Sequence, residues 1–487
     1  MVTVAESGSE VDLLIRHGVT IPMVGVKDFS PGLPVDAARG IIFDGAVAID
    51  NGRIIAVGTT DEVSAQYTGR RSIDAHHRAV LPGLIDTHHH FLQNFLKGAR
   101  DDLSFPDWID QVSAPLITLA VNDYLAGHSE LQRQATRLGC IEALKSGITT
   151  ILNMEWATHP DVIDVYEETG IRAVHTLTLT DVDQWQQEGM LLPLAEAWAL
   201  SERLAERCRH SVGGRITFRY GPACENSASA ALLAAVREQA DATGAGIHIH
   251  IAESRVGWDN IQQRFGKTPV AYLNDIGLLG PDVLGAHCIW LTEDDLQILR
   301  DTGTSVSFTP ECHMKLALGV APVVKMLASG IPVSLGTDTC AVNDNMDMFE
   351  AMRTGIFLQR IALADHRVMP AYEALEMVTM GGARALGMAG EIGSLEPGKK
   401  ADVILVNLDG VHLRPINDIV NNLVYAGHAS DVETVLVDGR VVVEKGHLCG
   451  LDEMAAIAGA EEYAQQRFKQ AGIRVSPYWA GAMSAAA

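Results

Sequence analysis

The chain has 487 residues, 47% of them apolar, and a formal charge of −24. A chain of this length is too long to form one small hydrophobic core and long enough for a large barrel plus a second domain. The acidic balance argues against a basic nucleic-acid-binding face, and no apolar run reaches the length of about 20 residues that a membrane-spanning helix needs.

The N-terminus and the cysteines indicate a cytoplasmic protein. The first ten residues are polar and acidic and lack the basic and apolar regions of a secretory signal. The seven cysteines are scattered, odd in number and without CxxC pairs, which is typical of reduced thiols rather than a disulfide framework. We expect small-molecule ligands and no membrane or nucleic-acid partner.

Both ends of the chain show short strands separated by turns. In the N-terminal part these are residues 11–15, 45–49, 54–57 and 73–81, and in the C-terminal part 401–406, 434–437 and 440–443. Neither set buries a core alone, so we predict one composite β-sandwich domain from residues 1–80 and 388–450. A helix over about 452–471 is expected in a C-terminal helical extension, residues 451–487.

Between these ends, residues 81–387 alternate strand-like runs with amphipathic helical stretches. The strand candidates are 84–88, 149–153, 172–177, 215–220, 246–251, 283–287, 306–309 and 333–336. The helix candidates include 129–146, 161–169, 192–209, 229–243 and 293–302. Eight such units predict an α/β fold, a (β/α)₈ TIM-like barrel whose site lies at the carboxyl ends of the strands. A doubly wound open sheet is the alternative, although no GxGxxG follows the first strand.

Two histidines close the first barrel strand. Residues i and i+2 of a strand point to the same face, so His88 and His90 aim at one point while His89 points away. Later strand ends carry His250 with Glu253, then His287, then Asp338. Groups this far apart in sequence but at the same end of successive strands predict a single transition-metal site.

These motifs resemble the amidohydrolase superfamily, in its mononuclear deaminase and triazine-hydrolase branch. The resemblance rests on six segments: PGLIDTHHH (82–90), GITT (147–150), HIHIAES (248–254), AHC (286–288), GTD (336–338) and GSLEPGKKADVILV (393–406). It implies that His88, His90, His250 and Asp338 bind one divalent metal per chain, Zn²⁺ or alternatively Fe²⁺. It also implies a homo-oligomer, a dimer or higher.

The same resemblance assigns catalytic roles. The metal lowers the pKa of its water towards 7, and Asp338 accepts a proton from that water. Glu253 matches the proton-shuttling glutamate of the family. His287 is expected to stabilise the transition state, with metal ligation as the alternative. His248 is expected to pack in the core.

The expected substrate pocket contains Gln93, Trp108, His313, Asn343 and Asp344, with Trp108 able to stack on a flat ring. Residues 311–316 read ECHMKL, where many deaminases of this branch carry Ser-Asn-x-Lys-Leu, and this departure leaves the substrate open.

The predicted activity is hydrolytic attack by metal-bound hydroxide on an sp² carbon of an amino- or chloro-substituted N-heterocycle. The leading hypothesis is an aminohydrolase (deaminase) that acts on a purine, pyrimidine or s-triazine-like compound. Dechlorination of a triazine by the same attack is a variant of this hypothesis. The alternatives are hydrolysis of a non-heterocyclic amide, carbamate or urea, and a scaffold without catalysis. The fourth strand ends without a lysine for carbamylation, which favours one metal over two.

Overall fold

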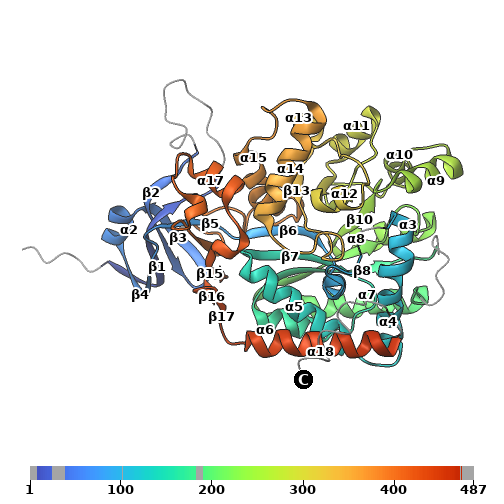
Figure 1. The fold of residues 1–487 in the computed structure, drawn as a ribbon, viewed down its shortest axis with the longest axis horizontal. Coiled ribbons are helices and arrows are strands. Elements are labelled where there is room, and N and C mark those ends of the chain that lie inside the picture. The colour runs from blue at the N-terminus through green and yellow to red at the C-terminus, as the bar shows by residue number, and fades with distance from the viewer. Residues whose placement is uncertain (1–7, 25–38, 101–102, 183–189, 472, 474–487) are drawn as a thin grey trace, which may run out of the picture.

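The computed structural model describes residues 8–24, 39–100, 103–182, 190–471 and 473. Within them, two sheets lie side by side, a nine-stranded mixed sheet at one end of the molecule and a barrel beside it (Figure 1). No helix in these ranges is both long and apolar enough to cross a bilayer. All seven cysteines are free thiols, as the sequence predicts.

The barrel is an eight-stranded parallel sheet in consecutive order, which confirms the TIM-like prediction. Its strands are β6 (Leu84–His89), β7 (Ile148–Glu155), β8 (Arg172–Leu179), β9 (Ile216–Pro222), β10 (Gly246–Ile251), β11 (Val283–His287), β12 (Ser305–Phe308) and β13 (Val333–Leu335). The ring closes where Asp338 N donates to His88 O at 2.8 Å and His90 N donates to Asp338 O at 3.3 Å. His88, His90 and Asp338, which close the ring, are three of the four predicted metal ligands.

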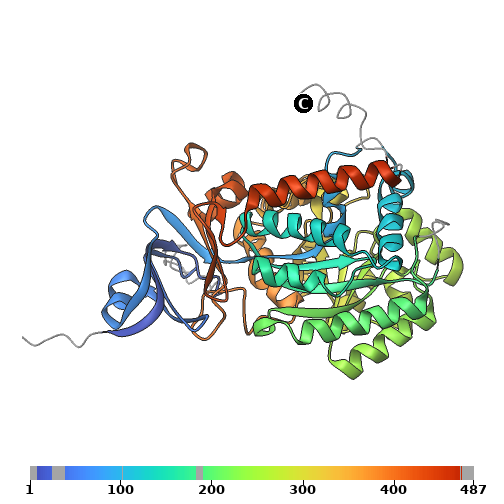
Figure 2. The same ribbon diagram turned by 90° about the horizontal axis from the view of Figure 1, so that it is seen from below.

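Helices cover the outside of the barrel (Figures 1 and 2). Those between the strands begin with α3 (Phe105–Trp108), α4 (Ala114–Leu125), α5 (Glu130–Lys145), α6 (Val162–Thr169), α7 (Leu194–Arg209), α8 (Ala230–Thr243), α9 (Arg255–Phe265), α10 (Pro269–Ile276) and α11 (Glu293–Thr302). They continue with α12 (Pro310–Lys315) and α13 (Val323–Ala328), and after β13 come α14 (Met348–Leu363), α15 (Ala371–Glu376) and α16 (Gly382–Ala385). Gly170 and Gly244 end α6 and α8 at φ of 83° and 70°, a left-handed conformation that glycine adopts without a Cβ clash.

The nine-stranded sheet joins both ends of the chain. Its N-terminal strands are β1 (Ser9–Thr20), β2 (Ile42–Asp50), β3 (Arg53–Thr59), β4 (Tyr67–Asp74) and β5 (Arg78–Pro82). Its C-terminal strands are β14 (Val403–Asn407), β15 (Val432–Val437), β16 (Arg440–Glu444) and β17 (His447–Leu448), and β14 pairs antiparallel with β5. The predicted strand 73–81 is two strands here, because the chain turns at His77, whose φ is 61°. The predicted domain limits stay a prediction.

A buried ion pair fastens the nine-stranded sheet to the barrel. Arg172, the first residue of β8, donates two hydrogen bonds to Asp402, at 2.8 and 3.0 Å, and one to Asp438 at 2.7 Å. Arg172 lies at the amino end of its strand, whereas the predicted ligands lie at or just beyond carboxyl ends. The contact therefore holds the sheet at the end of the barrel opposite the site.

The last described helix, α18 (Glu453–Ala471), packs along α5 on the outside of the barrel (Figure 2). Lys145 of α5 pairs with Glu453, and Arg467 pairs with Asp123 of α4 (Ala114–Leu125). Residues 472 and 474–487 of the predicted extension lie outside the described residues.

Candidate metal centre and active site

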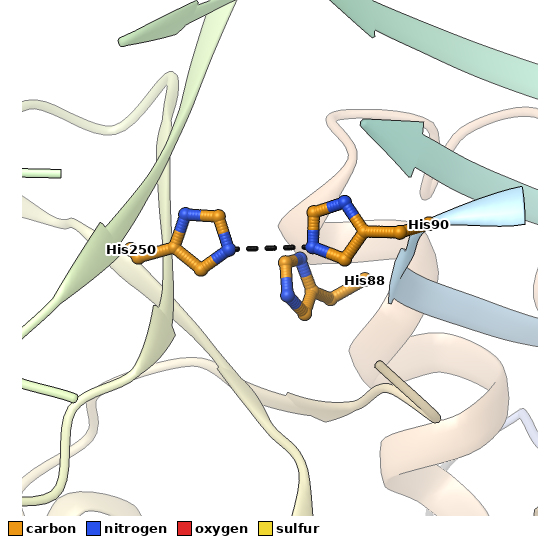
Figure 3. A group of neighbouring side chains, drawn as sticks. All are labelled: His88, His90 and His250. Atoms are coloured by element: carbon orange, nitrogen blue, oxygen red, sulfur yellow. Dashed lines mark hydrogen bonds between the residues drawn. The ribbon is translucent and has the colours of Figure 1, made fainter. Parts of the chain in front are cut away.

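Three imidazoles meet at the carboxyl end of the barrel (Figure 3). His88 and His90 come from β6 and the residue after it, and His250 comes from β10. Their ligand nitrogens lie within 4.8 Å of one another, and His250 Nε2 is 3.4 Å from His90 Nε2. Asp338 Oδ1 is 3.5 Å from His88 Nε2 and 3.8 Å from His90 Nε2. The structure thus brings all four predicted ligands together.

The outer contacts of two imidazoles fix which nitrogen faces the cluster. His90 Nδ1 lies 2.6 Å from Met154 O, and His250 Nδ1 lies 2.6 Å from Ala223 O. A carbonyl oxygen only accepts, so each Nδ1 carries the hydrogen and each neutral ring keeps its Nε2 lone pair. Metal-binding histidines are oriented by such contacts.

His88 is oriented through a second histidine. His248 Nδ1 lies 3.0 Å from Leu284 O and therefore donates, which leaves His248 Nε2 as the acceptor for His88 Nδ1 at 2.7 Å. His88 Nε2 then presents a free lone pair, and this buried atom has no hydrogen-bond partner among the described residues. An unpartnered acceptor facing two more free imidazole nitrogens and a carboxylate fits a divalent metal.

Burial favours the neutral rings that a metal requires. Burial lowers the pKa of His88 and His90 well below the usual value, and the neighbouring imidazoles lower both further. Burial also lowers the pKa of His250. His89, by contrast, faces Thr337 Oγ1 and Asn94 Oδ1, each at 2.9 Å, and stays outside the cluster.

Replacing His248 by alanine is expected to weaken metal binding roughly 10- to 100-fold, because His88 loses the acceptor that fixes its tautomer and ring orientation. Metal dissociation constants, measured by competition with a chromophoric chelator, test this. His175→Ala is the matched control, since His175 is also a fully buried barrel histidine but lies outside the cluster. Equal losses of metal affinity in the two variants would show that His248 acts only by packing in the barrel core.

Glu253 and His287 lie beside the imidazole cluster. His287, from the end of β11, is buried, and its Nε2 lies 3.7 Å from Glu253 Oε1. His287 Nδ1 contacts Thr309 Oγ1 at 3.0 Å and His313 Nε2 at 3.3 Å, while its Nε2 has no hydrogen-bond partner among the described residues. Burial raises the pKa of Glu253 well above the usual value, and the charges of Asp338 and Glu225 raise it further. Glu253 therefore favours its protonated, donating form.

A pocket opens at this cluster, and His90, His250, Asp338 and Glu253 line it. Concave sites of this kind bind small organic ligands. Phe105 and Trp108, both from α3 (Phe105–Trp108), are nearly parallel, with ring centroids 6.4 Å apart. The other apolar wall residues include Ile109, Trp156, Met190, Leu191, Leu316 and Val342. The wall therefore suits a flat, uncharged ring.

The predicted pocket residues fall into two groups. Gln93 and Trp108 line the pocket. His313 is buried behind His287, Asn343 donates from Nδ2 to Thr337 O at 3.1 Å, and Asp344 pairs with Lys315; none of these three lines the pocket. Their contact with substrate stays a prediction.

Sequence reasoning did not single out several wall residues, notably Trp156, Met190 and Leu191. They lie in loops after β7 and β8, where no hydrophobic period marks them. These loops form one wall of the pocket only once the barrel has closed.

A parallel barrel with an imidazole and carboxylate cluster at the carboxyl ends of its strands defines the class of metal-dependent barrel hydrolases. Comparisons with known proteins agree. Residues 79–442 match the amidohydrolase family, and residues 45–69 match a bacterial imidazolonepropionase-like composite domain. The chain belongs to the amidohydrolase family and is a hydrolase that acts on C–N bonds.

Among similar sequences, a 5'-deoxyadenosine deaminase of Methanosarcina barkeri is 37% identical over 89% of this chain and 96% of its own length. A 5-methylthioadenosine/S-adenosylhomocysteine deaminase of Syntrophomonas wolfei is also 37% identical, over 89% of this chain and 97% of its own.

Among solved structures, an adenosine deaminase of Xanthomonas campestris with bound zinc has a TM-score of 0.85 and 27% identity, covering 95% of this chain and 100% of its own. The zinc complex of atrazine chlorohydrolase from Arthrobacter aurescens shares the fold, with a TM-score of 0.80 and 23% identity over 93% of this chain and 100% of its own.

Proposed function

We propose that the chain is a metal-dependent aminohydrolase that replaces the amino group of an N-heterocycle by oxygen, with 6-aminopurine nucleosides as the first candidates. The observation that carries this proposal is the position of Glu253, which lines the aromatic pocket and lies 3.7 Å from His287 Nε2 beside the imidazole cluster. Burial raises the pKa of Glu253, which favours a role as proton donor. The deaminases among the similar sequences support the choice of ring.

His88, His90, His250 and Asp338 would hold one divalent ion, for which Zn²⁺ is the first choice and Fe²⁺ the alternative. When bound, the ion supplies an activated water at neutral pH. The sequence of β9 contains no lysine that would bridge a second ion, which supports one ion per chain.

The residues of the chain then move the protons. Glu253 donates its proton to a ring nitrogen as the water oxygen adds to the neighbouring carbon, and Asp338 takes the first proton of the water. The second water proton passes through Glu253 to the amino group, the C–N bond breaks, and ammonia leaves. The proton on Asp338 returns to Glu253, so the product is the oxo form of the ring. His287 Nε2 faces this region and has no hydrogen-bond partner among the described residues. In the neutral tautomer that carries its hydrogen on Nε2, His287 donates to the oxygen that gains negative charge and stabilises it.

The test is ammonia release by metal-replete enzyme across aminopurine nucleosides, aminopyrimidines, pterins and amino-s-triazines, with chloride release from chlorotriazines measured in parallel. Release of ammonia from at least one ring class is expected. No ammonia from any of them, together with turnover of a simple amide, carbamate or urea, would replace deamination by the alternative activity. Metal analysis near two ions per chain would contradict the single-ion site.

Homo-oligomerisation, a cytoplasmic location and the division into residues 1–80 with 388–450, 81–387 and 451–487 stay predictions. Sedimentation of the purified protein measures the first of these.

A further inference from the structure

Glu253 lies in a three-residue link, 252–254, between β10 and α9, and the backbone of this link has an unusual conformation. Ala252, which precedes Glu253, has a φ of 49°, in the left-handed region. A residue with a Cβ rarely adopts this conformation, and it persists where surrounding contacts hold it. The direction of the Glu253 side chain therefore depends on the contacts that fix Ala252.

Glu225, in the loop after β9, makes one of these contacts. Glu225 is 3% exposed, and its Oε1 accepts a hydrogen bond from the backbone N of Ala252 at 3.3 Å. On the other side, the carbonyl oxygen of Ala252 accepts from the backbone N of Ile289 and of Trp290, each at 3.2 Å. The loop after β9 and the segment after β11 thus hold the two peptide groups that flank Ala252.

The next residue, Asn226, ties the same loop to α9. Asn226 Nδ2 donates to Gly257 O at 3.1 Å and to Glu225 Oε1 at 3.4 Å, and Asn226 Oδ1 accepts from Asn260 Nδ2 at 2.9 Å. Glu225, Asn226 and Glu253 line one cavity, and of these three only Glu253 also lines the active-site pocket. Glu225 therefore stands behind Glu253 as seen from the substrate.

We propose that Glu225 is a positioning residue, which through its hydrogen bond to Ala252 holds the Glu253 carboxyl group where it donates its proton to the substrate ring. This inference rests on the proposed deaminase function and deepens it. Glu225 belongs neither to the metal cluster nor to the lining of the active-site pocket, so its effect on the reaction passes through Glu253. A displacement of about 1 Å at a reacting group can lower a rate about 100-fold.

Two variants separate the hydrogen bond from the charge. Glu225→Leu removes the acceptor and is expected to lower kcat roughly 10- to 100-fold, with KM changed less than about threefold and metal content as in the parent. Glu225→Gln keeps an acceptor oxygen at the same reach and should keep kcat within a few-fold of the parent. Glu311→Leu removes another buried carboxyl group outside the pocket lining, and this control should leave kcat near the parent value.

A double-mutant cycle with Glu253→Gln shows whether Glu225 acts through Glu253. In that background, Glu225→Leu should change the residual kcat by less than about twofold, because no carboxyl proton is left to position. An equal fold-loss in both backgrounds would overturn the proposal, since it would indicate a general structural effect. Glu225→Gln as slow as Glu225→Leu would also overturn it, because the charge rather than the hydrogen bond would then matter.

Glu225→Asp serves where Glu225→Leu does not fold. It keeps the charge but withdraws the acceptor by one methylene, so its kcat should fall below that of Glu225→Gln, and the reverse order would contradict the proposal. Crystal structures of the parent and of the slower variant should show the Glu253 carboxyl group displaced. An unmoved carboxyl group would overturn the positioning role whichever bond the enzyme hydrolyses, whereas the absence of ammonia release from every ring would overturn the proposed function itself.

Discussion

The Glu253→Gln variant is expected to lose about a thousandfold in kcat/KM while it retains its metal. Glutamine keeps the size of the side chain but carries no exchangeable acid proton, so neither the ring nitrogen nor the leaving amine receives one. Glu253 touches none of the four proposed ligands at hydrogen-bonding distance, so the metal site should survive the change. Steady-state kinetics and metal content of the same preparation provide the measurement.

Glu311→Gln is the matched control for this variant. Burial also raises the pKa of Glu311, to about 8, but Glu311 lies in α12 outside the imidazole cluster and the pocket lining. A loss of similar size in both variants would indicate a general effect of buried carboxyl groups. Wild-type turnover by Glu253→Gln would assign proton transfer to another group.

Removing the divalent ion is expected to abolish turnover and to lower the thermal unfolding temperature by a few degrees. A ligand that binds only the folded state stabilises it by about 4 kcal/mol when its concentration is a thousandfold above the dissociation constant. The four proposed ligands come from opposite sides of the barrel and from its seam, so they form one site only in the folded chain. Activity and calorimetry before and after chelation, and after adding Zn²⁺ or Fe²⁺ back, measure both effects.

His90→Asn should reproduce the chelated state without a chelator, since it removes one imidazole from the cluster. His210→Asn is its control, because His210 lies exposed at the end of α7, far along the sequence from any ligand. Chelated protein with unchanged activity and unchanged unfolding temperature would remove the metal from the mechanism.

The barrel was predictable because each strand carries a local signal. The bounds predicted for residues 246–251 and 283–287 coincide with β10 and β11, where β-branched and small apolar residues end abruptly at a polar motif. The i, i+2 spacing likewise places His88 and His90 on one side of β6 with His89 on the other.

The pocket was less predictable because it is made by loops. Trp156 and Met190 belong to segments without a repeating pattern, and their proximity depends on how far each loop extends above the barrel. The link from His248 to His88 was also missed, since packing and hydrogen bonding look identical in a strand sequence. For Asp344 the sequence predicted too much. Its carboxylate follows the Asp338 motif closely in sequence, but in the fold it pairs with Lys315 and does not line the pocket.

The seam between β6 and β13 has a consequence for biosynthesis. His88 and His90 are among the early residues of the barrel to leave the ribosome, and Asp338, which hydrogen-bonds to their backbone, is among the last. A nascent chain that ends before β13 holds the imidazoles but neither the carboxylate nor a closed ring. Binding of an ion by the full set of proposed donors would therefore await synthesis of the final barrel strand.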